Sequence, residues 1–198
     1  MRLNLSSDQV GFIVRGKLNE EHSPGLMEQH ADCILSSGEP IGYFGGEGAA
    51  SSGSSSGSWN RSGLNMKGFV ADYQKMRQVR PFYVDLSLAK RYSVISTVLI
   101  LDVGYGKAVL FDKFWNDLKR NPGAFYLVGR NCSSTSSRAF VAASILNRGI
   151  PGLDTPNNLY RQLRSQLQSK ATSYSGYIGF IKNNSSNKFD IEIEETDQ

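Results

Sequence analysis

The sequence predicts an α+β fold in which an antiparallel β-sheet packs against a few helices. Short strand-like segments separated by turn residues fill the first third of the chain, whereas later segments show helical periodicity and end at Gly, Pro or Asn. With 198 residues, of which 39% are hydrophobic, the chain is long enough for one hydrophobic core and short for two. We therefore expect one compact domain.

The N-terminal third is predicted to form strands. Residues 10–18 alternate loosely between apolar and polar side chains, and residues 28–46 are typical of a β-hairpin with Ser-Ser-Gly-Glu-Pro as its turn. The segment AASSGSSSGS, at residues 49–58, consists of six serines, two glycines and two alanines and cannot bury enough apolar surface to become ordered. We expect a flexible Ser/Gly loop there.

The middle of the chain is predicted to continue the sheet. Two moderately apolar segments around Pro81, at 66–75 and 79–88, are interpreted as strands. Residues 91–103 form the strongest predicted strand because they are rich in Val, Ile, Leu and Thr. The apolar run within this segment is about half of the roughly 20 residues that a membrane helix needs, so no transmembrane segment is expected.

Helical periodicity dominates the second half of the chain. Between residues 106 and 120, apolar side chains recur at helical spacing, and the segment stops at Asn-Pro-Gly. The remaining predicted elements are a strand at 125–128, helices at 133–147 and 156–170, and a strand at 174–182.

The net charge of +4 conceals an uneven distribution. Residues 188–198 contain five acids and one base, so residues 1–187 carry 21 bases and 13 acids, a net charge of +8. This pattern predicts a basic domain at 1–187 and an acidic tail at 188–198. Because the bases are dispersed and no aromatic–basic repeat is present, we expect an anionic surface such as a cell wall, and not nucleic acid, as partner.

The small number of cysteines and histidines limits the chemistry. Cys33 and Cys132 cannot build a disulfide framework, and a four-ligand zinc site would need both of them together with His22 and His30. The spacing of these four residues matches no zinc-ligand pattern, so neither a metal nor another cofactor is expected.

Cys132 is the candidate nucleophile. It lies at a predicted strand-to-helix junction, where the positive end of the helix dipole and the nearby Arg130 would lower the pKa of its thiol. The main-chain N–H groups of Cys132 or Ser133 would be placed to donate to an oxyanion. The alternative interpretation is a small residue that is simply buried at a helix start.

A thiolate nucleophile needs a base, and His30 is the better of the two histidines. It lies on a predicted strand that places His30, Asp32 and Ile34 on one face, whereas His22 is predicted to lie in an exposed loop. A histidine on a strand and a cysteine at a helix start are what a papain-like site requires in space. A purely structural role for His30 is the alternative.

Two segments resemble a known family. HADCILSSGEPIGY (30–43) resembles the histidine hairpin of NlpC-type cell-wall peptidases, and PGAFYLVGRNCSS (122–134), followed by a helix and GIPGLDTPNNLY (149–160), is similar to the nucleophile segment of their circularly permuted branch. In that branch the histidine strands precede the cysteine helix, as they do here. The branch includes bacterial amidase-like hydrolases, acyltransferases related to lecithin:retinol acyltransferase, and toxins delivered by type VI secretion.

The resemblance implies a papain-like, permuted NlpC-type antiparallel sheet, with Cys132 as nucleophile and His30 as general base and then acid. In the peptidases, a third polar residue falls about twelve positions after the histidine, where this chain has glycine. We name Tyr43, one position further, as the candidate for orienting His30. Glu39, Glu47 and Asp32 are alternatives.

The function implied by the resemblance is that of a cysteine amidase or endopeptidase acting through a thioester on peptidoglycan peptides. As an antibacterial effector of type VI secretion, it would be made in the cytoplasm without a signal peptide, act in the periplasm of a target cell and have an immunity protein as partner. The alternatives are a cysteine-dependent acyltransferase or lipase on membrane lipids, and a non-catalytic binding domain.

Overall fold

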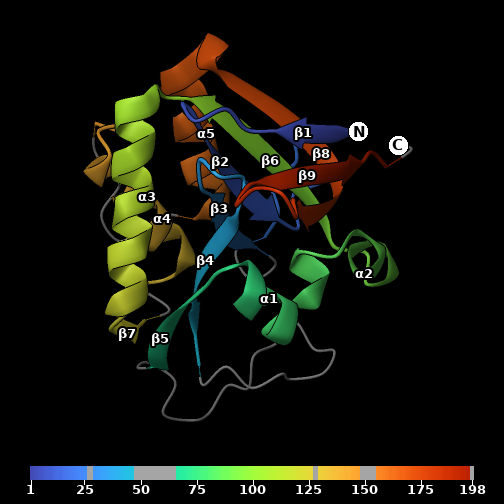
Figure 1. The fold of residues 1–198 in the computed structure, drawn as a ribbon, viewed down its shortest axis with the longest axis horizontal. Coiled ribbons are helices and arrows are strands. Elements are labelled where there is room, and N and C mark those ends of the chain that lie inside the picture. Colours follow the sequence, from blue (N-terminus) through green and yellow to red (C-terminus); the bar gives the residue numbers. More distant parts are fainter. Residues whose placement is uncertain (26–28, 47–65, 127–128, 148–154, 197–198) are drawn as a thin grey trace.

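The computed structural model describes residues 1–25, 29–46, 66–126, 129–147 and 155–196. Its described strands form one open sheet of nine strands, in the order β1-β9-β8-β6-β2-β3-β4-β5-β7 (Figure 1). Every strand pair is antiparallel. The prediction of an α+β fold with an antiparallel sheet is therefore confirmed.

The strands are β1 (Arg2–Asn4), β2 (Gln9–Arg15), β3 (His30–Ile34), β4 (Pro40–Gly45), β5 (Met66–Ala71), β6 (Ile95–Asp102), β7 (Ala124–Phe125), β8 (Ala171–Lys182) and β9 (Phe189–Glu194). The helices are α1 (Tyr73–Val79), α2 (Leu86–Arg91), α3 (Tyr105–Arg120), α4 (Cys132–Ala142) and α5 (Pro156–Leu167). Two short 3₁₀ turns are η1 (Pro81–Tyr83) and η2 (Gln168–Lys170).

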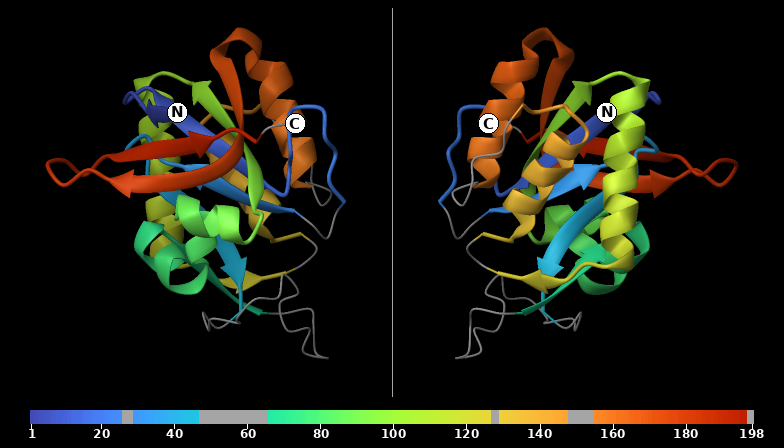
Figure 2. Two further views of the ribbon diagram at one scale, coloured as in Figure 1. Left: turned by 90° about the vertical axis from the view of Figure 1, so that its right-hand side faces the viewer. Right: turned by 90° about the vertical axis from the view of Figure 1, so that its left-hand side faces the viewer.

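The sheet separates two hydrophobic layers. Helices α3, α4 and α5 pack together on one face, where Phe111 and Phe140 are buried (Figure 2). The shorter helices α1 and α2 flank the other face, whose core includes Met76 and Val84. Since both faces of the central strands are covered, β2 is apolar almost throughout, as expected for a strand buried on both sides.

Strands β3 and β4 separate at one end of the sheet, and this separation positions the site. Strand β3 pairs with β2 over its full length, from His30↔Arg15 to Ile34↔Gly11. Its ladder with β4 has Asp32↔Gly42 as its last pair, and β4 continues along β5 instead. The first two residues of β3 therefore lie beyond the β3–β4 ladder, next to the start of α4.

Most predicted elements are confirmed. The hairpin at 28–46, the strand at 91–103 and the helix at 106–120 correspond to β3–β4, β6 and α3. Helix α5 and strands β2 and β8 lie within three residues of their predicted positions. Helix α4 ends at Ala142, before the predicted end at 147, and residues 127–128 of the strand predicted at 125–128 lie outside the described residues. The predicted Ser/Gly loop at 49–58 lies outside the described residues.

The predicted strand at 66–75 is confirmed only as far as residue 71, where α1 follows, and the predicted strand at 79–88 is wrong, because η1 and the start of α2 occupy it. Each helix begins at an aspartate whose carboxylate accepts a main-chain hydrogen bond three residues later: Asp72 from Lys75 and Asp85 from Leu88, both at 2.9 Å. These caps satisfy N–H groups that a helix start would otherwise leave unpaired, and they favour helix over strand.

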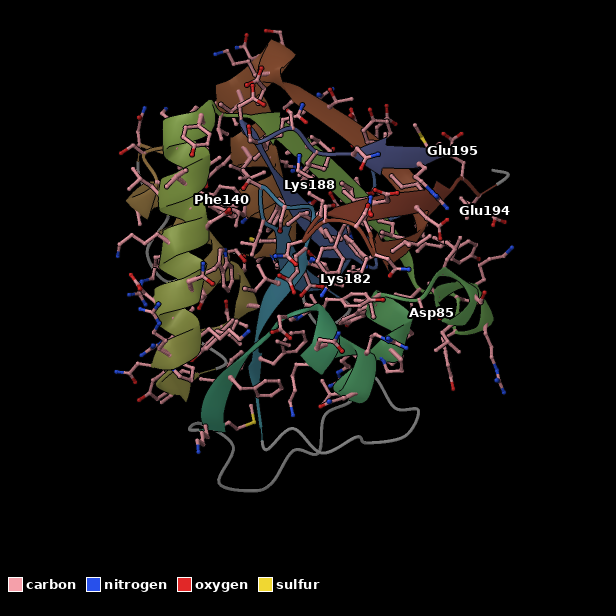
Figure 3. All side chains as sticks on the ribbon, in the orientation of Figure 1. Asp85, Phe140, Lys182, Lys188, Glu194 and Glu195 are labelled. Atoms are coloured by element: carbon pink, nitrogen blue, oxygen red, sulfur yellow. The ribbon has the colours of Figure 1, made fainter. Side chains whose placement is uncertain are left out.

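The predicted acidic tail is also corrected, because much of it is strand β9. This strand lies between β1 and β8, with Phe189, Ile191 and Ile193 in the core and acidic residues between them. Glu194 and Glu195 lie on the far side of the molecule from Phe140 (Figure 3). The alternation FDIEIE has the period of a strand with one buried face.

In the described part of the chain, no helix is both long enough and apolar enough to span a bilayer.

If β9 is part of the core, Ile191→Ala should lower the free energy of unfolding by about 2–5 kcal/mol, since it deletes a fully buried side chain. Urea denaturation measures this change. The control Glu194→Ala removes a surface ion pair with Lys90 and should cost less than about 1 kcal/mol. Equal effects of the two substitutions would show that residues 188–198 are a tail after all.

Candidate active site

Cys132 and His30 meet where β4 has left β3. The His30 ring forms a hydrogen bond with the Cys132 thiol, and the Ala31 N–H donates to the same sulfur. Because Leu35 N–H donates to Glu39 O at 2.9 Å, the odd-numbered residues of β3 direct their main-chain groups toward β4. Ala31 lies past the end of that ladder, so its N–H is available to the cysteine.

Helix α4 begins at Cys132 because Asn131 caps it. The Asn131 carboxamide accepts the Ser134 N–H at 2.9 Å, and the Ser134 hydroxyl accepts the Asn131 N–H at 2.9 Å, which completes a capping box. The helical ladder starts with Thr135 N–H donating to Asn131 O. The N–H groups of Cys132 and Ser133 precede that ladder, at the positive end of the helix dipole.

Asp32 holds the other side of the His30 ring. His30 Nε2 lies 2.8 Å from Asp32 Oδ1, which leaves Nδ1 for the Cys132 thiol. Arg15 Nε donates to the second oxygen, Asp32 Oδ2, at 2.9 Å. The side chains of Asp32 and Arg15 are 0% and 3% exposed, so this carboxylate is shielded from water and paired on both oxygens.

Aromatic rings fix the plane of His30. Its ring stacks against Phe44 with centroids 4.4 Å apart and against Tyr83 with centroids 5.5 Å apart, the latter at an angle of 11°. His30 therefore has a defined orientation as well as a defined hydrogen-bond partner.

The electrostatics favour a thiolate beside a protonated imidazole. Burial alone would raise the pKa of Cys132, but the charge and hydrogen bond of His30, together with the Ala31 N–H, lower it. Burial alone would lower the pKa of His30, but Asp32 and Cys132 hold it well above its ordinary value. Burial opposes ionisation of Asp32 too, yet His30 and Arg15 lower its pKa.

Gly42 provides the space that Asp32 occupies. It lies directly opposite Asp32 in the β3–β4 ladder, and a Cβ atom at this position would lie 2.2 Å from Asp32 Oδ1. No real Cβ contact is so short, so any other residue here would displace the carboxylate. The orienting carboxylate and the glycine opposite it are thus a matched pair.

The structure corrects the prediction that Tyr43 orients His30. The Tyr43 hydroxyl lies 3.0 Å from Pro122 O and 2.8 Å from Ala124 O, and its single proton is shared between these two main-chain acceptors. Arg130 Nη2 donates to the same Pro122 oxygen at 2.7 Å. Tyr43 therefore holds the segment that leads into α4, and Asp32 occupies the orienting position.

The other residues that the sequence offered as candidates have no place in the Cys132–His30–Asp32 arrangement, as far as the structure describes them. Cys33 is fully buried, and burial raises the pKa of its thiol, which disfavours a thiolate. His22 Nδ1 accepts a hydrogen bond from Leu18 N–H at 3.2 Å, away from the Cys132–His30 pair. Glu39 faces Asp72 and Lys119, and Glu47 lies outside the described residues.

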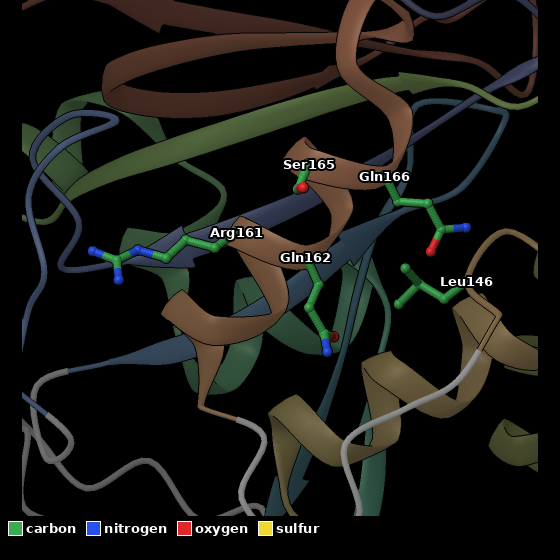
Figure 4. Close-up of a pocket in the computed structure, with 5 residues that line it drawn as sticks. All are labelled: Leu146, Arg161, Gln162, Ser165 and Gln166. Atoms are coloured by element: carbon green, nitrogen blue, oxygen red, sulfur yellow. The ribbon is translucent and has the colours of Figure 1, made fainter.

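Neither a metal cluster nor a surface hollow adds to this site in the described part of the chain. Among the residues that the structure describes, no three His, Cys, Asp or Glu side chains cluster closely enough to hold a metal ion. A surface hollow of about 420 Å³ lies between α5 and the end of the α4 region (Figure 4) and is lined by Leu146, Arg161, Gln162, Ser165 and Gln166. It contains no member of the Cys132–His30–Asp32 arrangement.

No protein-family model, curated protein or solved structure matches the chain. The functional argument therefore depends on the geometry of these side chains.

The roles of Asp32 and Tyr43 can be separated with Asp32→Asn and Tyr43→Phe. Without the carboxylate that holds the imidazolium, the pKa of Cys132 should rise, and each unit of rise lowers the thiolate fraction at pH 6 about tenfold. We expect at least this loss in the rate of Cys132 alkylation by iodoacetamide, followed by peptide mass. Tyr43→Phe should leave the rate unchanged and cost about 1 kcal/mol of stability. The reverse pattern would restore Tyr43 as the orienting residue.

The matched pair predicts that Gly42→Ala slows alkylation of Cys132 and lowers the free energy of unfolding by about 1–3 kcal/mol, as overpacking does. The control is Gly106→Ala in α3, where an added Cβ meets no atom within 4 Å in the described structure. Both variants are compared with the wild type by alkylation rate and urea denaturation. An unchanged alkylation rate in Gly42→Ala would contradict the proposed placement of Asp32.

Proposed function

We propose that the protein is a papain-like cysteine hydrolase of the permuted NlpC type. The observation that carries this proposal is the Cys132–His30–Asp32 arrangement, in which a thiol with a lowered pKa is hydrogen-bonded to an imidazole that a buried carboxylate orients. Such a set supplies an activated nucleophile, a proton carrier and an orienting group. The order along the chain, with the histidine strand before the cysteine helix, agrees with the permuted branch.

The first half of the proposed reaction forms a thioester. The Cys132 thiolate attacks an amide carbonyl, and the N–H groups of Cys132 and Ser133 donate to the resulting oxyanion. Protonated His30 then gives its Nδ1 proton to the leaving amine as the C–N bond breaks. Asp32 keeps the ring in place through Nε2 throughout.

The second half returns the enzyme to its starting state. Neutral His30 takes a proton from a water molecule, which attacks the thioester carbonyl. The tetrahedral intermediate collapses, the C–S bond breaks, and a carboxylic acid leaves with Cys132 again a thiolate beside a protonated imidazole. The chemistry uses side chains of this chain and needs no cofactor.

Peptidoglycan peptides are the substrate class that we favour. The resemblance to NlpC-type enzymes supports this choice, as does the basic character of residues 1–187, since the bacterial wall is anionic. The same resemblance makes an antibacterial effector, delivered into the periplasm of a target cell and neutralised by an immunity protein, the biological role that we propose.

Aromatic side chains near His30 favour a second candidate, a cysteine-dependent acyltransferase or lipase. The ring of Phe44, which stacks on His30, also stacks on Phe69, with centroids 5.6 Å apart. The ring of Tyr83 contacts that of Phe82, with centroids 4.9 Å apart. Phe69, Phe82 and Tyr83 are all partly exposed. They provide an apolar flank that would suit an acyl chain.

The test incubates the purified protein with peptidoglycan sacculi and, separately, with phospholipid vesicles. We expect release of peptide fragments from sacculi, loss of this release in Cys132→Ala, and its retention in Cys33→Ser. Because the reaction needs a thiolate and a protonated imidazole, the rate should fall below the pKa of Cys132 and above that of His30. Release of fatty acid instead would favour the lipase.

Two outcomes would refute a cysteine hydrolase. The first is product release that survives Cys132→Ala. The second is slow alkylation of wild-type Cys132 at both pH 6 and pH 8, which would leave a non-catalytic binding domain as the better interpretation.

A further inference from the structure

Arg15 is a buried arginine next to the proposed catalytic pair. It is the last residue of β2, lies opposite His30 in the β2–β3 ladder and is 2% exposed. A guanidinium in such a place needs hydrogen-bond partners that compensate for its lost hydration. Its partners are therefore informative.

Arg15 contacts two residues with different parts of its guanidinium. Nε donates to Asp32 Oδ2 at 2.9 Å, and Nη2 donates to the main-chain oxygen of Tyr83 at 2.9 Å. The guanidinium carbon also lies 4.7 Å from the centroid of the Tyr83 ring. One side chain of β2 thus links β3 to η1.

Both partners of Arg15 act on His30. Asp32 uses its other oxygen, Oδ1, to hold His30 Nε2 at 2.8 Å, and the Tyr83 ring stacks nearly parallel to the His30 ring. We propose that Arg15 is a positioning residue for the Cys132–His30 pair: its guanidinium holds the Asp32 carboxylate and the Tyr83 ring against His30. This inference rests on the proposed cysteine-hydrolase function.

The charges around Asp32 explain why Arg15 affects the thiol. The charged groups that act on the Asp32 carboxylate are Arg15 from β2 and His30 from β3, and Cys132 from α4 acts on His30 in turn. With Arg15 present, the two cations, Arg15 and the His30 imidazolium, balance the two anions, the Asp32 carboxylate and the Cys132 thiolate. Without it, the carboxylate faces one cation, takes up a proton at higher pH and then no longer stabilises the imidazolium.

Lysine would not replace Arg15 fully. An ammonium group is a point charge, whereas the planar guanidinium has several donors in a fixed arrangement and also stacks on aromatic rings. The bond to Asp32 and the bond to Tyr83 use two different nitrogens of that plane. Arg15→Lys should therefore keep the charge and lose part of the positioning.

The test measures the pH midpoint of Cys132 alkylation by iodoacetamide, in which thiolate formation is observed without a substrate. Arg15→Met should raise this midpoint by about one pH unit, because the Asp32 carboxylate without Arg15 is protonated more easily and then stabilises the imidazolium beside Cys132 less. Arg15→Lys should keep the midpoint near the wild-type value. In the peptide-release assay, both variants should lower kcat and leave KM unchanged.

Two further variants make the test specific. In an Asp32→Asn background, Arg15→Met should cause no additional shift, because Arg15 acts through that carboxylate; this double variant also leaves no unpaired buried charge. Arg2→Met is the control, since Arg2 is an exposed strand arginine that bonds Glu192 at 2.8 Å, and it should change nothing. Circular dichroism confirms that each variant is folded.

The outcomes separate this inference from the proposed function. Slow alkylation of wild-type Cys132 at both pH 6 and pH 8 would refute the proposed function and the role of Arg15 with it. A wild-type midpoint that is low, together with an unchanged midpoint in folded Arg15→Met, would overturn the role of Arg15 alone. A further shift of the midpoint by Arg15→Met in the Asp32→Asn background would also overturn the role of Arg15. If Arg15→Met alone does not fold, the role of Arg15 is overturned when Arg15→Lys and the double variant fold and both retain the wild-type kcat.

Discussion

The Asp32 carboxylate is buried and carries one hydrogen bond on each oxygen, from Arg15 Nε and His30 Nε2. A buried carboxylate without partners would cost several kcal/mol, so these two bonds are conditions for placing Asp32 there at all. The Asp32 charge favours a protonated His30, and the protonated His30 and a thiolate at Cys132 favour each other. The charge state of the proposed nucleophile thus depends on a carboxylate that is buried on β3.

The fold makes room for this arrangement by separating two strands. The β3–β4 ladder ends at Asp32↔Gly42, and the absence of a side chain at Gly42 lets the carboxylate lie across the strand boundary. Beyond that point, the start of α4 takes the place of β4, and the Ala31 N–H donates to the Cys132 sulfur. Tyr43 holds the segment before α4. The strand ends and the helix cap therefore determine the site together.

The sequence predicted the proposed nucleophile and the proposed base because each depends on local signals: a cysteine after a capping asparagine, and a histidine at the start of an alternating strand. It did not identify Asp32, although Asp32 was among the alternatives, because the family pattern directed attention to the returning strand. The deciding facts, the register opposite Gly42 and the bond from Arg15, are contacts between distant segments. Helix α1 depends on the cap from Asp72, a single residue, and in β9 the acidic residues that alternate with the apolar ones give the segment the composition of a solvated tail.

The protonation state of His30 tests the central claim most directly. The chain has two histidines, His22 and His30, so a ¹⁵N NMR spectrum of the labelled protein can resolve both rings, with His30→Gln as the assignment control. We predict that both ring nitrogens of His30 carry protons at pH 7 and that Asp32→Asn abolishes this state. A neutral His30 ring at pH 7 in the wild-type protein would contradict the account.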